Sequence, residues 1–150
     1  MKWTHRFRIN APVEAIYENG FAPDRWFSFY KAYRGLDSVD GRWPEEGSSI
    51  VVRYAVLGPW TVQVKQTVVE HQRGRLLRLR EEALGGLWID RIAFEFALED
   101  GATAVTLRLD PTSRWLWGRP LVLLVWVLGA FMTPPAMQRF RAMVEDASAT

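Results

Sequence analysis

The sequence contains no cysteine and only two histidines, His5 and His71. A chain without cysteine forms no disulfide, holds no iron–sulfur cluster or thiolate-bound zinc, and has no thiol nucleophile. Two histidines are too few to build a histidine metal cage. These absences exclude most classes of metalloenzyme, and we expect no metal and no other cofactor.

Lysine is also scarce, because sixteen of the nineteen basic residues are arginine. The formal net charge is +2, and basic and acidic residues are interspersed along the chain. Nucleic-acid-binding domains normally cluster their basic residues, so we expect no nucleic-acid partner. The first residues lead directly into an alternating polar and apolar stretch without a signal-peptide pattern, which favours a cytoplasmic protein.

Aromatic residues, by contrast, are abundant. Eight tryptophans occur among twenty aromatic side chains, in a sequence of 150 residues that is 49% hydrophobic. This length and composition predict a single globular domain over residues 1–150. Large flat side chains at this density indicate either a thick aromatic core or a cavity for an apolar ligand.

The N-terminal part has the pattern of one strand followed by short helices. Alternation over residues 3–9 predicts a strand with His5 on its apolar face. The asparagine and proline that follow are typical of a helix start, and Gly20 is typical of a helix end. A second short helix is predicted over residues 23–30, and a brief strand near residues 36–39.

Antiparallel strands follow from residue 49 to residue 110, and two turns set their register. Asp100-Gly101 predicts a type I′ turn, which needs positive φ at both central residues and aligns the apolar faces of its two strands. Gly85-Gly86 predicts a second tight hairpin, which sets Glu81 opposite Asp90. A slip of one residue would turn apolar side chains to the wrong face, so we reject the slipped register.

Two further turns extend this meander. Arg73-Gly74, taken as a two-residue turn, sets Gln66 opposite Glu81 on the same inner face. At Gly58-Pro59 a three-residue loop is needed to align the apolar faces of the flanking strands. The sequence therefore predicts a continuous antiparallel sheet.

The C-terminal part is apolar and helical. Residues 121–132 carry no polar side-chain atom except the Trp126 indole nitrogen. A helix of that length spans about 18 Å, too short to cross a hydrocarbon core of roughly 30 Å. Thr133-Pro134-Pro135 should break or kink the helix, because proline lacks an amide donor. Beyond it, apolar residues recur at helical spacing from Met137.

This order of elements resembles the START-like (SRPBCC, helix-grip) superfamily. The resemblance rests on FRINAPVEAIY at residues 7–17, on the hairpins and on the tail around residues 137–144, and it covers essentially the whole chain. It implies an α+β fold, with an antiparallel sheet of about seven strands wrapped around a long C-terminal helix and two short helices after strand one. It also implies a ligand cavity between sheet and helix, as in the polyketide cyclase/dehydrase and lipid-transport branch. Since the superfamily shares no catalytic residues, it implies fold more firmly than function.

Three polar residues are expected side by side on the inner face of the sheet: Gln66, Glu81 and Asp90. Two carboxylates facing each other across a hairpin repel, so one should take a raised pKa or recruit an arginine. The three side chains would anchor a ligand hydroxyl or carbonyl group, or serve as a general acid/base pair. Alternatively, they lie at the wet rim of the sheet and contact only water.

The remaining candidate ligand contacts are aromatic or histidine side chains. Trp88 and Tyr54 are expected to line a pocket, because their polar tips need partners. His5 is a candidate because it shares the inner face of the first strand, although a structural role is the simpler interpretation when no serine or cysteine is placed to pair with it. His71, beside a turn, is expected to be exposed.

Three functions stay open on this evidence. The first is binding of an apolar small molecule, such as a lipid, isoprenoid or polyketide-like compound, in the cavity. The second is a cyclase/dehydrase-like enzyme in which Glu81 or Asp90 moves protons, although no catalytic constellation is recognisable and we assign no catalytic residue. The third is a structural, dimerising domain with a vestigial pocket.

The apolar residues 121–132 also need a cover, because a helix lying on a sheet buries only one stripe. Possible covers are the segment containing Trp26 and Phe27, a second subunit, or a membrane interface flanked by tryptophans and Arg119. A homodimer is the first expectation, and a peripheral membrane contact is the second.

Overall fold

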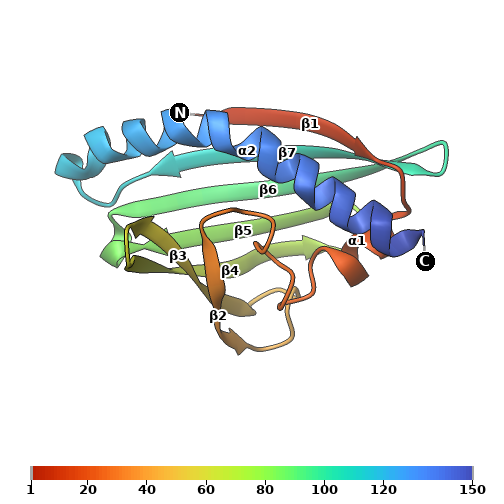
Figure 1. Ribbon diagram of the computed structural model, residues 1–150, viewed down its shortest axis with the longest axis horizontal. Helices are drawn as coiled ribbons and strands as arrows, with labels where there is room; N and C mark the ends of the chain where they lie inside the picture. Colours follow the sequence, from red (N-terminus) through yellow and green to blue (C-terminus); the bar gives the residue numbers. More distant parts are fainter. Residues whose placement is uncertain (1, 150) are drawn as a thin grey trace.

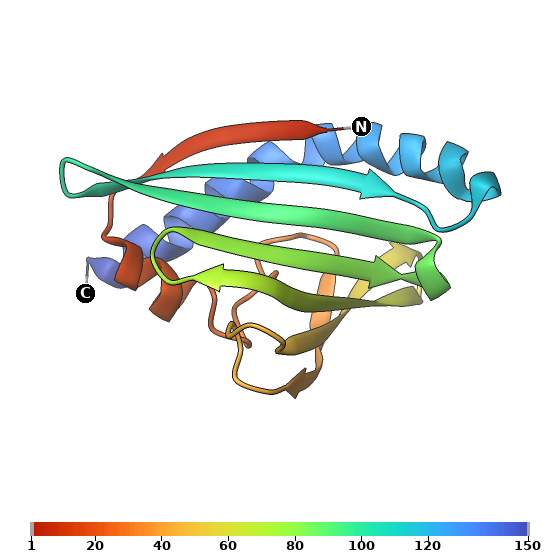
Figure 2. The same ribbon diagram turned by 180° about the vertical axis from the view of Figure 1, so that it is seen from behind.

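The computed structural model describes residues 2–149 and shows one antiparallel sheet with a long helix lying across it (Figure 1). The sheet has seven strands in the order β1-β7-β6-β5-β4-β3-β2. Figure 2, from behind, shows the face of the sheet that the long helix does not cover. The elements are β1 (Trp3–Ile9), α1 (Val13–Asn19), β2 (Tyr33–Asp40), β3 (Ser49–Leu57), β4 (Trp60–Gln72), β5 (Leu76–Ala83), η1 (Leu84–Gly86), β6 (Trp88–Glu99), β7 (Ala102–Thr112), η2 (Leu116–Gly118) and α2 (Arg119–Ser148). The helix-grip architecture expected from the sequence is confirmed.

Two turns adopt the conformations that the sequence predicts. Asp100 and Gly101 have φ angles of 49° and 79°, as a type I′ turn requires. Both residues of Gly85-Gly86 also have positive φ. Across this second turn Glu81 pairs with Asp90, as predicted.

The other two turns reach the predicted register by a different route. The β4–β5 loop holds three residues between Gln72 and Leu76, and a bulge at Val69 then shifts the pairing so that Gln66 still faces Glu81. The β3–β4 turn holds two residues rather than three, with a compensating bulge before it. Each bulge restores the alternation that keeps apolar side chains on the inner face.

Only one of the two short helices expected after strand one is present. It is α1, and it ends at Gly20 as predicted. The helix predicted over residues 23–30 is instead a series of turns, so that prediction was wrong. Phe27 has a φ of 68°, and a continuous right-handed helix cannot contain that conformation. The turns instead place Trp26 in the core, fully buried.

The final helix runs unbroken through Thr133-Pro134-Pro135. The predicted break is therefore absent, while Figure 1 shows the axis of α2 changing direction midway along the helix. Its second half is held against the domain by the burial of Ala136, Met137, Phe140 and Val144. That burial offsets the loss of the two hydrogen bonds that the prolines cannot donate.

The first half of α2 is far less buried than the second. By length and composition the segment Leu116–Ser148 could cross a membrane, yet its second half belongs to the core of the domain. Of the three possible covers for the outer side of the first half, Trp26 and Phe27 do not serve, because both side chains lie inside the core. Apolar side chains such as Leu124 therefore remain exposed.

Candidate functional site

A cavity of about 250 Å³ lies between the sheet and the first half of α2. The sheet contributes Tyr54 from β3, Glu81 from β5, and Trp88 and Asp90 from β6. The turn after α1 contributes Phe27 and Tyr30, and α2 closes the cavity with residues that include Val125, Trp126, Leu128, Met132 and Thr133. Its walls are mainly apolar, with a few polar groups at defined points, as is typical of small-molecule sites.

The predicted polar row is present on the inner face. Gln66 pairs with Glu81 across β4 and β5, and Glu81 pairs with Asp90 across β5 and β6. Gln66 and Asp90 are both buried. Gln66 and Asp90 therefore do not lie at a wet rim of the sheet, while Glu81 between them is partly exposed.

Hydrogen bonds hold the first two members of the row. The indole Nε1 of Trp26 donates to Oε1 of Gln66 at 2.7 Å, and Nε2 of Gln66 donates to Oε2 of Glu81 at 2.6 Å. The other carboxyl oxygen of Glu81 accepts from Trp88 Nε1 at 2.9 Å. Burial raises the pKa of Glu81, and these two donated hydrogen bonds oppose that rise. The result is a carboxyl fixed in orientation at the cavity wall.

Asp90 behaves differently, because its carboxyl accepts from backbone N–H groups, that of Asp110 at 2.9 Å and that of Arg91. Burial, followed by the charge of Glu81, raises the pKa of Asp90 to about 8. One of two facing carboxyls was expected to show this shift. At neutral pH the Asp90 carboxyl is mainly protonated, so it can donate a hydrogen bond to a ligand.

Two tyrosine hydroxyls complete the polar part of the lining. Burial is the largest cause of the raised pKa of both Tyr30 and Tyr54, and the charge of Glu81 adds to it. Both hydroxyls therefore stay protonated at neutral pH. Tyr30 also bonds to the hydroxyl of Thr133 on α2, which ties the turn after α1 to the helix.

Sequence reasoning did not single out Trp126 as a candidate ligand contact. Its indole nitrogen is buried, and it is the one buried side-chain N or O atom without a hydrogen-bond partner in the part of the chain that the structure describes. Trp126 lines the cavity. A signal was present in the sequence, since this nitrogen is the sole polar side-chain atom in residues 121–132.

The structure brings together most of the predicted ligand contacts, but not all of them. Tyr54, Glu81, Trp88 and Asp90 line the cavity, and Gln66 lies behind them, bonded to Glu81. His5 does not line the cavity. It is stacked between Trp3 and Phe7 on β1, with ring-centroid distances of 5.4 and 5.5 Å, which is the structural role.

His71 is not exposed as predicted. Its side chain is only 3% exposed, and its Nε2 lies 2.9 Å from the hydroxyl of Tyr17 on α1. The fold places α1 over the end of β4, a contact that the position of His71 beside a turn could not reveal. Among residues 2–149, no group of three or more His, Asp or Glu side chains could hold a metal ion.

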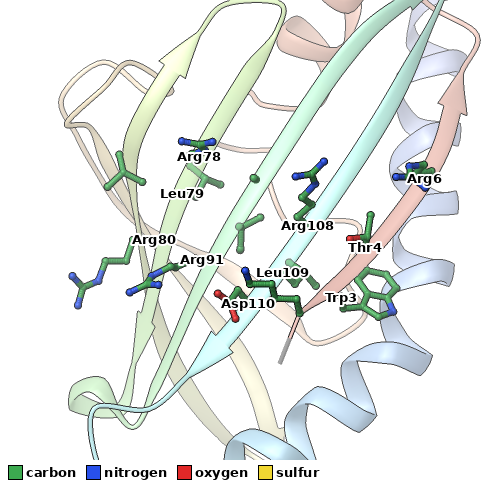
Figure 3. A pocket seen from close by; sticks show the side chains of 14 residues that line it. Trp3, Thr4, Arg6, Arg78, Leu79, Arg80, Arg91, Arg108, Leu109 and Asp110 are labelled. Atoms are coloured by element: carbon green, nitrogen blue, oxygen red, sulfur yellow. The ribbon is translucent and has the colours of Figure 1, made fainter.

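A second, wider hollow of about 730 Å³ lies on the outer face of the sheet (Figure 3). Arginines from four neighbouring strands surround it: Arg6, Arg78, Arg80, Arg91 and Arg108. Three of them pair with glutamates on the sheet, at distances of 2.6 to 3.5 Å. This hollow is a charged outer surface, whereas the cavity under α2 has mainly apolar walls.

Solved structures share this fold over the full chain. A Thermus thermophilus protein, TTHA0849, is 21% identical, with a TM-score of 0.69 and 99% of both chains covered. Ara h 8.0201 is 10% identical, with a TM-score of 0.73 over 96% of this chain and 97% of that chain. The di-domain ARO/CYC StfQ from the steffimycin biosynthetic pathway is 10% identical, with a TM-score of 0.75 over 99% of this chain and 52% of that chain.

No protein-family model and no curated protein sequence matches the chain. The likeness to solved structures nevertheless shows its fold. The chain has a helix-grip fold, as its sequence resemblance to START-like (SRPBCC) proteins implied.

Proposed function

We propose that this protein binds an uncharged apolar small molecule, with an oxygen atom at one end, in the cavity between the sheet and the first half of α2. The observation that carries the proposal is the buried Trp126 indole N–H, which has no acceptor within the described chain. Leaving such a donor unpaired costs about 1–3 kcal/mol. A ligand carbonyl or hydroxyl oxygen would accept its hydrogen bond.

The other polar groups of the lining support an uncharged oxygen rather than an ionised head group. Protonated Asp90 and the hydroxyl of Tyr54 are both donors at neutral pH. The apolar part of the molecule would contact the aliphatic and aromatic walls, such as Val125 and Phe27.

The functions typical of this fold support the proposal. Proteins of this fold typically bind a hydrophobic ligand or act as cyclases. One of the similar structures is described as an ARO/CYC of a biosynthetic pathway. A role as an enzyme is thus the second candidate for this chain.

One observation favours that second candidate. A carboxyl with a pKa near 8, beside a cavity, is suited to give a proton to a ligand carbonyl oxygen at neutral pH. In that case Asp90→Asn would abolish turnover of a poly-β-ketone while ligand binding changes little. A binding protein would show no turnover with either form.

Fluorescence titration with an environment-sensitive naphthyl ketone tests the binding proposal, because this probe joins an apolar ring system to one carbonyl oxygen. Trp126→Phe keeps an aromatic ring but removes the N–H together with the five-membered ring, and it should raise the Kd about tenfold, the equivalent of one lost hydrogen bond. Trp117→Phe is the matched control, because Trp117 is exposed on η2 and does not line the cavity. Equal binding by the wild type and Trp126→Phe, or no binding by the wild type, would show the proposal to be wrong.

A further inference from the structure

Exposed apolar side chains gather at one end of the molecule. Figures 1 and 2 both show the β3–β4 turn, η1 and the start of α2 at this end, with the first turns of α2 projecting beyond the end of β7. The backbone N–H of Arg114 donates to the carbonyl of Gly86 at 2.9 Å, which joins the segment before η2 to η1. We call this surface the apolar end. Its exposed members are Val56, Leu57, Trp60, Leu84, Trp115, Leu116, Trp117, Leu123, Leu124, Val127, Leu128 and Phe131.

We propose that the apolar end docks onto the surface of an anionic lipid bilayer, and that the ligand passes between bilayer and cavity at this contact. The second clause rests on the proposed function. The helix lies on the membrane and does not span it, because its second half, with Phe140 and Val144, is part of the core. Exposed apolar side chains gathered in this number at one end mark an interaction site.

Charge favours a membrane over a second copy of this chain. Residues 47–69 and 111–144, which supply most of the apolar end, contain no acidic residue, and Arg119 lies at the start of α2. Arg114, just before it, pairs with Glu82 at 3.1 Å. In a two-fold dimer the same patch faces itself, so Arg119 would find no acidic partner in these segments. The anionic lipids of a bilayer would instead attract it.

The aromatic residues of the apolar end point to the same occupant. Trp60, Trp115 and Trp117 are exposed on two separate segments. Tryptophan is enriched where membrane proteins meet the head-group layer, because its ring is apolar and its N–H is polar. An apolar surface with tryptophans and arginines at its margin is typical of an interfacial contact.

The docking surface and the cavity share a wall. Leu128 and Met132 line the cavity, and each is also about half exposed, at 49% and 48%. A displacement of either side chain would open the cavity onto the apolar end. When this end is seated in lipid, an apolar ligand could therefore enter without crossing water.

Vesicle flotation of the full chain tests the docking. The wild type should float with vesicles of phosphatidylcholine and phosphatidylserine, and less with phosphatidylcholine alone. Leu124→Glu should reduce the bound fraction about tenfold or more, since it puts a charge into the lipid contact. Leu98→Glu is the matched control, because Leu98 is also an exposed leucine, at 80% against 56% for Leu124, but lies beside the β6–β7 turn at the other end. Phe131→Ser, at another exposed position, repeats the test if Leu124→Glu does not fold.

Arginine variants identify the face that meets the lipid. Arg119→Gln should lower binding to phosphatidylserine vesicles several-fold, while Arg80→Gln, on the outer face shown in Figure 3, should leave it unchanged. The reverse result would assign lipid contact to the outer arginine face and overturn the proposal. Light scattering of the same samples tests whether the apolar end binds a second copy of the chain. If the wild type is a dimer that does not float, and Leu124→Glu is a monomer, the apolar end mediates self-association and the proposal is wrong.

The docking and the ligand proposals fail separately. If the wild type binds the naphthyl ketone but ignores both kinds of vesicle, docking is wrong and ligand binding stands. If the wild type floats but binds no ketone, the apolar end is a membrane contact, and the ligand passage is wrong. Faster transfer of bound ketone to phosphatidylserine vesicles from the wild type than from Leu124→Glu would support both.

Discussion

Glu81 and Asp90 face each other across β5 and β6, and both carboxyls line the cavity under α2. Both carboxyls accept hydrogen bonds, but burial and the charge of Glu81 raise the pKa of Asp90. Glu81 accepts bonds from two side-chain donors, Gln66 and Trp88, while Asp90 accepts from backbone groups such as the Asp110 N–H and carries a pKa raised to about 8. A pair of like groups is thereby divided into one fixed acceptor and one proton-bearing donor, the arrangement that a site for an uncharged oxygen needs.

The raised pKa of Asp90 predicts a stability that falls with increasing pH. Its ordinary value is 3.8 and its value in the fold is about 8, so between these limits the folded chain binds the extra proton. The free energy of unfolding should then decrease by up to about 1.4 kcal/mol per pH unit across that window. Asp90→Asn should remove most of this slope in urea titrations at several pH values. Asp24→Asn, outside the cavity, should keep it.

Replacing Glu81 by glutamine should destabilise the fold. Gln66 Nε2 and Trp88 Nε1 both donate hydrogen bonds to the two carboxyl oxygens of Glu81. In the variant one of these oxygens is replaced by an NH₂ group, so one of the two donors would face another donor and lose its hydrogen bond. The loss should be about 1–3 kcal/mol in denaturant unfolding. Glu82→Gln, on the other face of β5, should cost less than about 1 kcal/mol, because its arginine pairs are at the surface.

The same Glu81→Gln variant should also lower the pKa of Asp90, because the charge of Glu81 is one cause of its rise. The downward slope of stability should then end at a lower pH than in the wild type. An unchanged pH profile in Glu81→Gln would mean that the two carboxyls are not coupled.

The β6–β7 turn should not accept a β-branched residue. Gly101 has a φ of 79°, and a Cβ there would meet no atom within 4 Å, so any cost comes from backbone strain alone. Gly101→Val should lower the free energy of unfolding by about 1–3 kcal/mol. As a contrast, Gly129→Ala lies in α2 with open space around its Cβ, and it should stabilise by up to about 1 kcal/mol. Equal melting temperatures for wild type and Gly101→Val would remove the basis of the register argument.

The register of the sheet was readable from the sequence because a strand alternates with a period of two residues. The pairing of Gln66 with Glu81 illustrates how strongly alternation constrains the answer. Its turn was predicted with the wrong length, yet the bulge at Val69 restored the pairing. The segment over residues 23–30 shows the opposite case. Its aromatic spacing suggested a helix, but the segment forms a series of turns that place its aromatic side chains in the core.

The sequence by itself therefore determined the helix-grip order of elements and the row of polar residues on the inner face. Both follow from strands that are adjacent in the sequence and are joined by short turns. Only the tertiary structure decided which groups meet across long separations. Because α2 crosses the sheet, Trp126 lines the cavity, whereas His5 does not. The sheet also brings together, around the outer hollow, arginines that are interspersed with acidic residues along the chain. The pKa of Asp90 was decided in the same way, because the burial that raises it exists only once the helix covers the sheet.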